Sequence, residues 1–359
     1  MSLKIAIIGC GKIADAHVEE IRKISSASLV AVCDLEPIMA EQLATRYSVP
    51  HWYSDFSRML DEQQPDVLHI TTPPGSHLAL VRQALAAGCH VFLEKPVAPQ
   101  SADVRAILDA AETANRRLTV NYWPNFEEHA LALRGLVAKG ALGDIVHLES
   151  FYGYDLAGEY GTALRRDPNH WVRRLPGQLF QNVLDHALNK IVPYFTGDTP
   201  QVQVLAYQAG SGTNMQGGEL LDELRVMMRD GDISAYVTFS AHARPVGHHL
   251  RVYGTRNTAT ADFQMRTVTL DRKQGFPSAL GRLVPPFKVA KDYFRQGLGN
   301  VNHFAHARFH YFHGMHRLLA EFYRSIEENS EPPIPYAEIL RVSELMDAIF
   351  QQVYPVVTA

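Results

Sequence analysis

The chain has 359 residues, which at roughly 150 residues per domain favours two domains. Hydrophobic residues make up 46% and charged residues 20%, and the formal net charge is -4, so the composition indicates a soluble globular protein without a broad basic surface for nucleic acid. No run of about 18 apolar residues is present, and Met1 leads directly into an apolar run, so we expect a cytoplasmic protein with no membrane span and no signal peptide. The three cysteines, Cys10, Cys33 and Cys89, are too few for a disulfide framework and form no CxxC pair.

Short apolar runs alternate with amphipathic segments over the first third of the chain. The predicted buried strands are 3–8, 28–33, 66–71, 90–93 and 118–121, and the predicted helices are 13–24, 37–47, 76–87 and 101–115. Strands that alternate with helices of this length indicate βαβ units with right-handed crossovers. We therefore predict an α/β domain over residues 1–122 with a doubly wound parallel sheet of the Rossmann type.

The first predicted strand runs into a glycine-rich turn, GCGKIA over residues 9–14, which leads directly into a helix. In this GxGxxA pattern Gly9 allows the tight turn, Gly11 lets a pyrophosphate approach the backbone, and Ala14 lets helix and strand pack closely. The free N–H groups at the start of the helix, around Lys12 and Ile13, can then receive the diphosphate. A turn that serves packing alone is the alternative, but the position after an N-terminal strand favours dinucleotide binding.

Asp34 follows the second predicted strand. A carboxylate at this place accepts hydrogen bonds from the hydroxyls of the adenosine ribose. A 2′-phosphate would meet a like charge, and no arginine follows directly, so NAD is favoured over NADP. The alternative is that Asp34 is only the N-cap of the next helix.

Two later strand ends lie at the same carboxyl edge of the predicted sheet, where ligands bind in this architecture. One continues into residues 71–77, TTPPGSH, whose prolines stop strand pairing and keep the chain extended. The other continues into Glu94-Lys95-Pro96, which places a lysine between an acid and a rigid proline. We expect Thr72, Pro73 and His77 to lie beside the cofactor.

These motifs together resemble the Gfo/Idh/MocA family, named after glucose–fructose oxidoreductase, inositol dehydrogenase and a rhizopine catabolism protein. The resemblance implies NAD(P)-dependent oxidation or reduction of sugars, cyclitols or nucleotide sugars. It also implies that Lys95 contacts both the substrate hydroxyl and the nicotinamide. The expected cofactor-binding residues are Gly9, Gly11, Lys12, Ile13, Asp34, Thr72, Pro73, His77, Glu94 and Lys95.

The pattern changes after residue 122. We predict a helix over 127–138, a strand over 144–152, strands at 201–208, 220–228, 233–241, 249–253, 258–263 and 267–270, and a closing helix over 336–354. Consecutive strands with short turns indicate an open antiparallel sheet flanked by helices, an α+β domain over 123–359. In the family such a sheet forms one wall of the substrate site and often an oligomer interface, which implies a homodimer or homotetramer.

The segment 177–190 is the expected catalytic segment of this second domain. As a helix it places Asn182 and His186 one turn apart on one face. The family usually has Asp-x-x-x-His here, with the histidine as acid and base, so Asn182 is a departure that cannot ionise. Asp185 is a weak substitute, because it points about 100° away from that face.

Two further clusters have open interpretations. Arg165, Arg166, Arg173 and Arg174 flank Trp171, and this set either binds a substrate phosphate and stacks on a sugar or base, or is a solvated loop. The histidines between 303 and 316 have helical spacing, but the aromatic residues among them favour packing, and we expect no metal.

The residues themselves predict NAD binding and an acid–base site, and the family resemblance implies an NAD-dependent oxidoreductase that acts on a secondary hydroxyl of a sugar, cyclitol or nucleotide sugar. In this interpretation His186 takes the hydroxyl proton, Lys95 polarises the oxygen and Asn182 orients a neighbouring hydroxyl. Two alternatives remain open. One is a glycosidase that uses NAD transiently, and the other is a ligand-sensing regulator without turnover.

Overall fold

A computed structural model describes residues 2–197, 200–209, 220–272, 278–306 and 309–354. They form two compact units: Met1–Trp123 with Gly314–Glu344, and Pro124–His313 with Leu345–Ala359. Whether 1–122 and 123–359 are separate folding domains stays a prediction. None of the helices in the described ranges is both long and apolar enough to cross a bilayer.

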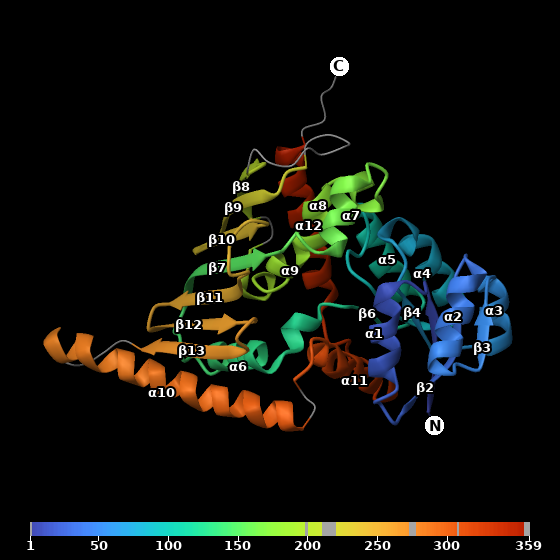
Figure 1. The fold of residues 1–359 in the computed structure, drawn as a ribbon, viewed down its shortest axis with the longest axis horizontal. Helices are drawn as coiled ribbons and strands as arrows, with labels where there is room; N and C mark the ends of the chain where they lie inside the picture. Colours follow the sequence, from blue (N-terminus) through green and yellow to red (C-terminus); the bar gives the residue numbers. More distant parts are fainter. Residues whose placement is uncertain (1, 198–199, 210–219, 273–277, 307–308, 355–359) are drawn as a thin grey trace, which may run out of the picture. The chain divides into compact units, whose positions relative to one another are not determined.

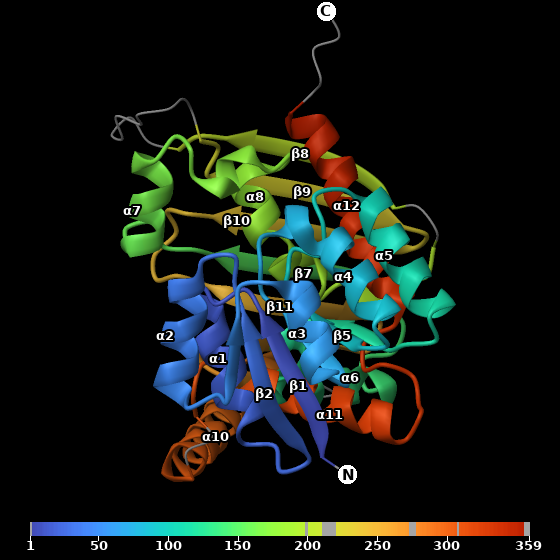
Figure 2. The same ribbon diagram turned by 90° about the vertical axis from the view of Figure 1, so that its right-hand side faces the viewer.

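The first unit contains a six-stranded sheet in the order β3-β2-β1-β4-β5-β6, with every pair parallel. Figure 2 shows β1 and β2 side by side within it. The strands are β1 (Leu3–Ile8), β2 (Ala27–Cys33), β3 (His51–Tyr53), β4 (Val67–Ile70), β5 (His90–Leu93) and β6 (Leu118–Val120). The chain leaves β1 toward β2 on one side and later returns to β4 on the other. The predicted doubly wound fold is therefore confirmed, with its switch point, where ligands bind, between β1 and β4.

The helices of this unit are α1 (Lys12–Ile21), α2 (Pro37–Tyr47), α3 (Phe56–Gln63), α4 (His77–Ala86), α5 (Ser101–Thr113) and α11 (His313–Glu327), with the short helix η1 (Pro74–Ser76). Four of these helices match the predicted amphipathic segments, and α3, α11 and η1 are additional. Sequence reasoning missed β3 and α3, because a three-residue strand with two exposed side chains has no readable period. The first compact unit also includes residues 314–344.

The second unit contains a seven-stranded sheet in the order β13-β12-β11-β7-β10-β9-β8. Its strands are β7 (Ile145–Gly153), β8 (Gln201–Tyr207), β9 (Glu223–Asp230), β10 (Ile233–Ser240), β11 (His248–Gly254), β12 (Asn257–Asp262) and β13 (Thr267–Arg272). Each predicted strand is present. The sheet is mixed rather than purely antiparallel, because β7 pairs with β10 in parallel. A parallel pair needs a long connection, and the chain between these two strands provides it.

The helices of the second unit are α6 (Glu128–Ala138), α7 (Glu159–Arg166), α8 (Gln178–Val183), α9 (Asp185–Leu188) and α10 (Ser278–Ala305), with η2 (Trp123–Phe126), η3 (Trp171–Arg174) and η4 (Val192–Tyr194). The closing helix is α12 (Tyr336–Val353). Figure 1 shows α10 running along β13 at the edge of the sheet, where Gln296 bonds to the backbone of Val268. The side of α10 turned away from β13 carries exposed apolar residues: Leu283, Phe287, Phe294, Leu298 and Val301. A helix usually buries its apolar side, so this stripe is unusual.

Candidate functional site

The glycine turn after β1 has the geometry that a dinucleotide requires. Gly9 has φ +97°, and a Cβ there would lie 2.8 Å from Thr72 Cγ2 and 2.9 Å from the Thr71 carbonyl carbon. Only glycine fits this position without strain. Gly11 precedes α1, and a Cβ there would meet nothing within 4 Å. The turn therefore leaves open space at the start of α1, where no side chain caps the helix and N–H groups are available for a diphosphate.

Asp34 is tied to the same turn. Its Oδ2 accepts a hydrogen bond from the Cys10 N–H at 2.6 Å, and its Oδ1 accepts one from the Glu36 N–H at 2.9 Å. The N-cap residue of α2 is Glu36, so Asp34 is not the N-cap that the alternative interpretation required. Each carboxylate oxygen has a second lone pair, which leaves acceptor capacity for ribose hydroxyls. The geometry fits the adenosine end of NAD.

The loop after β4 is held rigidly against the two neighbouring strand ends. The Thr71 hydroxyl donates toward the Ile8 and Gly9 carbonyls at 2.9 and 2.5 Å, and the Thr72 and Ser76 hydroxyls lie 2.7 Å apart. His77 is fully buried, with Nε2 2.8 Å from the Thr72 carbonyl and Nδ1 2.9 Å from the Val97 carbonyl. Burial lowers the pKa of His77, although its contacts with the two backbone carbonyls act in the opposite direction. A neutral ring has one N–H and therefore donates to one of the two carbonyls. A direct contact of His77 with the cofactor stays a prediction.

Glu94 and Lys95 lie where β5 reaches the carboxyl edge of the sheet. Glu94 is 6% exposed, and its Oε1 accepts hydrogen bonds from His17 Nε2 at 2.8 Å and Asn121 Nδ2 at 2.5 Å. Its Oε2 accepts the Lys95 N–H at 3.1 Å. Burial by itself would raise the pKa of Glu94, but these hydrogen bonds and the charge of Lys95 outweigh it, and the pKa is lowered. The buried carboxylate is thus ionised and fixes the backbone at Lys95, whose side chain is partly exposed.

The second unit contains the expected acid–base residues. The predicted single helix is broken at Leu184 into α8, which holds Asn182, and α9, which holds His186. The His186 ring stacks on Tyr152 of β7, with centroids 5.1 Å apart and planes at 29°. Asp185 is 1% exposed, and its Oδ1 accepts the His186 N–H at 2.8 Å. Both Asn182 and His186 are half-buried, whereas Asp185 belongs to the interior, which makes it a poor substitute for an exposed carboxylate.

A buried lysine next to His186 was missed by sequence reasoning. Lys190, 3% exposed, contacts Nε2 of His248 from β11 and lies 4.7 Å from the Phe263 ring centroid and 5.7 Å from that of Tyr152. Burial lowers the pKa of Lys190 well below its usual range, although the charge of Asp185 acts in the opposite direction. Burial and the neighbouring Lys190 likewise lower the pKa of His248. The only sequence signal was the i, i+4 spacing of His186 and Lys190.

The arginine and tryptophan cluster lies on α7 and η3. The Arg173 guanidinium donates to the Leu164 carbonyl at 2.8 Å and to the Arg165 carbonyl at 3.4 Å, so it caps the end of α7. Trp171 is 37% exposed and stacks on His170. A role of Arg173 or Trp171 in substrate binding stays a prediction.

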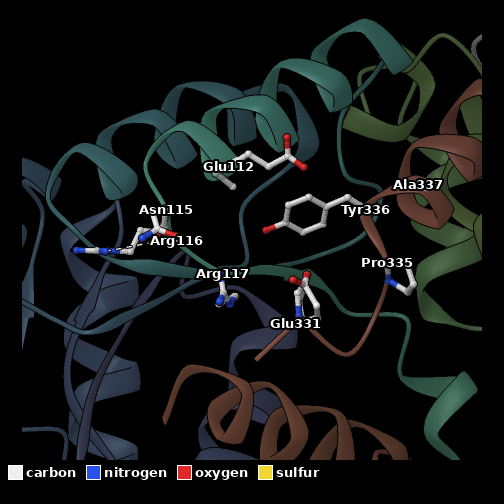
Figure 3. Close-up of a pocket in the computed structure, with 10 residues that line it drawn as sticks. Glu112, Asn115, Arg116, Arg117, Glu331, Pro335, Tyr336 and Ala337 are labelled. Carbon is white, nitrogen blue, oxygen red and sulfur yellow. Dashed lines mark hydrogen bonds between the residues drawn. The ribbon is translucent and has the colours of Figure 1, made fainter. Parts of the chain in front are cut away.

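Other candidate positions have structural partners. His303 pairs with Glu128 at 2.8 Å, and no group of three metal-ligating side chains is close enough for an ion in the described parts of the chain. Figure 3 shows a pocket of about 530 Å³ lined by Arg116, Arg117 and Tyr336. It lies before β6, at the amino edge of the sheet, and both arginines already donate to backbone carbonyls. This pocket is therefore separate from the candidate site.

Comparison with known proteins agrees with these features. Residues 3–122 match the family model described as "Oxidoreductase family, NAD-binding Rossmann fold", and residues 130–260 match the "GFO/IDH/MocA C-terminal domain". The chain is 35% identical over 144 residues to a D-glucoside 3-dehydrogenase of Escherichia coli (strain K12), which covers 40% of this chain and 41% of the relative. It is 31% identical over 165 residues to an inositol 2-dehydrogenase of Burkholderia ambifaria (strain MC40-6), and this match covers 45% of this chain and 49% of that relative. The matched segments are thus less than half the length of these relatives.

The fold also has counterparts among solved structures. The crystal structure of the WlbA dehydrogenase from Bordetella pertussis in complex with NADH and UDP-GlcNAcA has a TM-score of 0.75 and 18% identity, and the match covers 98% of this chain and 95% of that one. At this identity the similarity concerns the fold alone. Since the two family models match in order along most of its length, the chain belongs to the Gfo/Idh/MocA family of oxidoreductases, with an NAD-binding Rossmann domain at its amino-terminal end.

Proposed function

We propose that this protein is an NAD-dependent dehydrogenase that acts on a secondary hydroxyl, or the corresponding keto group, of a sugar or cyclitol. The observation that carries the proposal is the carboxyl edge of the parallel sheet. There the open turn at Gly11, the carboxylate of Asp34 and the Glu94-Lys95 pair follow the carboxyl ends of β1, β2 and β5 of one parallel sheet. The names of the relatives, a glucoside 3-dehydrogenase and an inositol 2-dehydrogenase, support this substrate class.

The proposed preference for NAD over NADP rests on Asp34. Its carboxylate is anchored by the Cys10 and Glu36 N–H groups and cannot easily turn away from an incoming ribose. A 2′-phosphate would bring a second negative charge to this place. The sequence that follows, Leu35-Glu36-Pro37, offers no guanidinium to neutralise it.

Each proposed catalytic residue has one chemical task. The nicotinamide, when bound, supplies the hydride acceptor. The Lys95 ammonium stabilises negative charge that develops on the reacting oxygen. The His186 imidazole takes the hydroxyl proton, the task that histidine most often performs as a general base. Asn182 has both a donor and an acceptor and orients a neighbouring ring hydroxyl.

A turnover assay with matched variants tests the proposal. Purified protein receives NAD and a panel of sugars, glucosides, inositols and nucleotide sugars, and reduced nicotinamide is followed by its near-ultraviolet absorbance. We expect Lys95→Met and His186→Phe each to lower kcat by about 100-fold or more, with NAD binding retained. The exposed Lys139, replaced by methionine, is the control for loss of a lysine and should leave turnover unchanged.

The alternatives give different results in the same assay. Cleavage of a chromogenic glycoside without accumulation of reduced nicotinamide would favour the transient-oxidation glycosidase. NAD binding with no turnover of any substrate in the panel would favour a sensor. Lys95→Met turnover at the wild-type rate would contradict the proposed role of Lys95.

We also propose that the protein is a homodimer or homotetramer. The apolar stripe of α10 and the exposed Leu205, Met227 and Tyr236 of the mixed sheet form apolar surface that a second copy would cover. Light scattering during gel filtration measures the mass directly. A single species of the chain mass, 40.1 kDa, would contradict this proposal.

A further inference from the structure

A chain of buried polar side chains lies behind Glu94, inside the first unit. The Tyr323 hydroxyl of α11 is 2.8 Å from His69 Nε2 on β4, His69 Nδ1 is 2.8 Å from His17 Nδ1 in α1, and His17 Nε2 is 2.8 Å from Glu94 Oε1. The exposed fractions are 1% for Tyr323, 0% for both histidines and 6% for Glu94. Four polar groups without access to water must satisfy one another.

The chemistry of the two ends sets the direction of every hydrogen bond. An ionised Glu94 carboxylate only accepts, so His17 Nε2 carries a proton and donates. At the other end, His69 is the one hydrogen-bond partner of the Tyr323 hydroxyl among the described residues, so its O–H proton is satisfied only if it donates to His69 Nε2. His69 then carries its proton on Nδ1 and donates to the bare Nδ1 of His17. Burial keeps His69 and Tyr323 neutral, because it lowers the pKa of His69 and raises the pKa of Tyr323.

The far end of this chain of side chains is closed to solvent, because Tyr323 is 1% exposed. In this order each imidazole uses one nitrogen as a donor and the other as an acceptor. The chain of side chains thus holds the Glu94 carboxylate, which in turn accepts the Lys95 N–H through its other oxygen at 3.1 Å. Asn121 adds a second donor to the same oxygen that His17 uses.

We propose that Tyr323, His69 and His17 are positioning residues that hold Glu94, and through it the backbone of Lys95, in the geometry needed for turnover. The expected effect on turnover rests on the function proposed above, whereas the order of the hydrogen bonds is independent of that function. Of the three, His17 contacts Glu94 directly, whereas His69 and Tyr323 act through His17, and α11 is more than 200 residues away from the Glu-Lys-Pro turn in the sequence.

The hydrogen-bond order is tested without substrate. Imidazole nitrogen shifts of ¹⁵N-histidine-labelled protein report which nitrogen carries the proton, and His17→Gln and His69→Gln variants assign the two signals. We expect His69 to be protonated on Nδ1 and His17 on Nε2 at neutral pH. A proton on Nε2 of His69, or a doubly protonated His17, would overturn the chain as described.

The positioning role is tested by removing one hydroxyl. Tyr323→Phe leaves the ring in place but takes the donor from His69, and we expect kcat to fall about tenfold while the Kd for NAD changes less than about twofold. Tyr53→Phe is the control, since its hydroxyl has side-chain hydrogen bonds to Glu62 and Gln63 but none to the Tyr323–His69–His17–Glu94 chain. Its kcat should be unchanged.

A second variant pair separates positioning from loss of folding. His17→Gln keeps an N–H that can reach Glu94, and His17→Phe does not, so we expect the glutamine variant to be the more active of the two. Equal kcat for Tyr323→Phe and the wild type would overturn the positioning role. A wild type without any turnover would contradict the proposed function, and the nitrogen shifts would then still decide the hydrogen-bond order.

Discussion

Replacing Lys190 with methionine tests whether the second unit really buries a neutral amine beside His186. The side chain is 3% exposed, and its surroundings are the ring of His248 and the faces of Phe263 and Tyr152. Desolvation of this kind penalises the charged form, so the pKa of Lys190 lies well below its ordinary value of 10.5. Methionine has a similar length and no charge.

The sign and size of the effect follow from proton linkage. Between the lowered pKa in the folded protein and 10.5, the unfolded chain holds a proton at this amine that the folded protein lacks. The free energy of unfolding therefore rises with pH in this window, by ~1.4 kcal/mol for each pH unit. Within this window the wild type gains ~1.4 kcal/mol for each pH unit, and Lys190→Met does not.

Urea unfolding at several pH values measures this difference. The cysteines titrate near their ordinary value of 9.0 only in the unfolded chain, because burial raises the pKa of Cys10 and Cys33 to about 12, but this contribution is common to both proteins. The lowered pKa of His248 changes the free energy of unfolding only around and below its ordinary value of 6.5, outside the pH window used for Lys190. Lys139→Met should keep the wild-type slope. Parallel curves for the wild type and Lys190→Met would refute the reasoning, since they would mean that Lys190 stays charged in the folded protein.

Three further variants test the nucleotide turn and the carboxylate of Asp34 beside it. Gly9→Ala should lower the free energy of unfolding by about 2 kcal/mol or more, because its Cβ meets the backbone of Thr71 at 2.9 Å and its φ is +97°. Gly11→Ala adds a Cβ that meets no atom within 4 Å, so it should leave the free energy of unfolding nearly unchanged but weaken NAD binding. Equal losses of stability for Gly9→Ala and Gly11→Ala would contradict this account. Asp34→Ser should weaken NAD binding roughly tenfold and reduce the preference for NAD over NADP. Calorimetric Kd values for both cofactors measure this preference. An unchanged ratio of the two Kd values would show that Asp34 does not select the cofactor.

The parts of the site that the sequence alone could predict are those made by neighbouring residues. The turn after β1, the acid after β2 and the Glu-Lys-Pro turn after β5 each lie within a few residues of a strand end. In a parallel sheet all carboxyl ends meet at one edge, so local patterns were sufficient to bring Gly11, Asp34 and Lys95 to the same side. The strands of the second unit were predictable for a similar reason, because each has its own local apolar pattern.

The supporting contacts were not predictable, because each joins side chains that are remote in the chain. His17, His69 and Tyr323 look like ordinary helix and strand residues in their own segments, and 254 residues separate the last two. Lys190 meets His248 only because α9 packs beside β7, which pairs with β11. Likewise the parallel pairing of β7 with β10 has no local signal. Residue type and spacing determined which groups face the ligand edge, whereas the burial that sets their charge and holds them in place came from packing between distant segments.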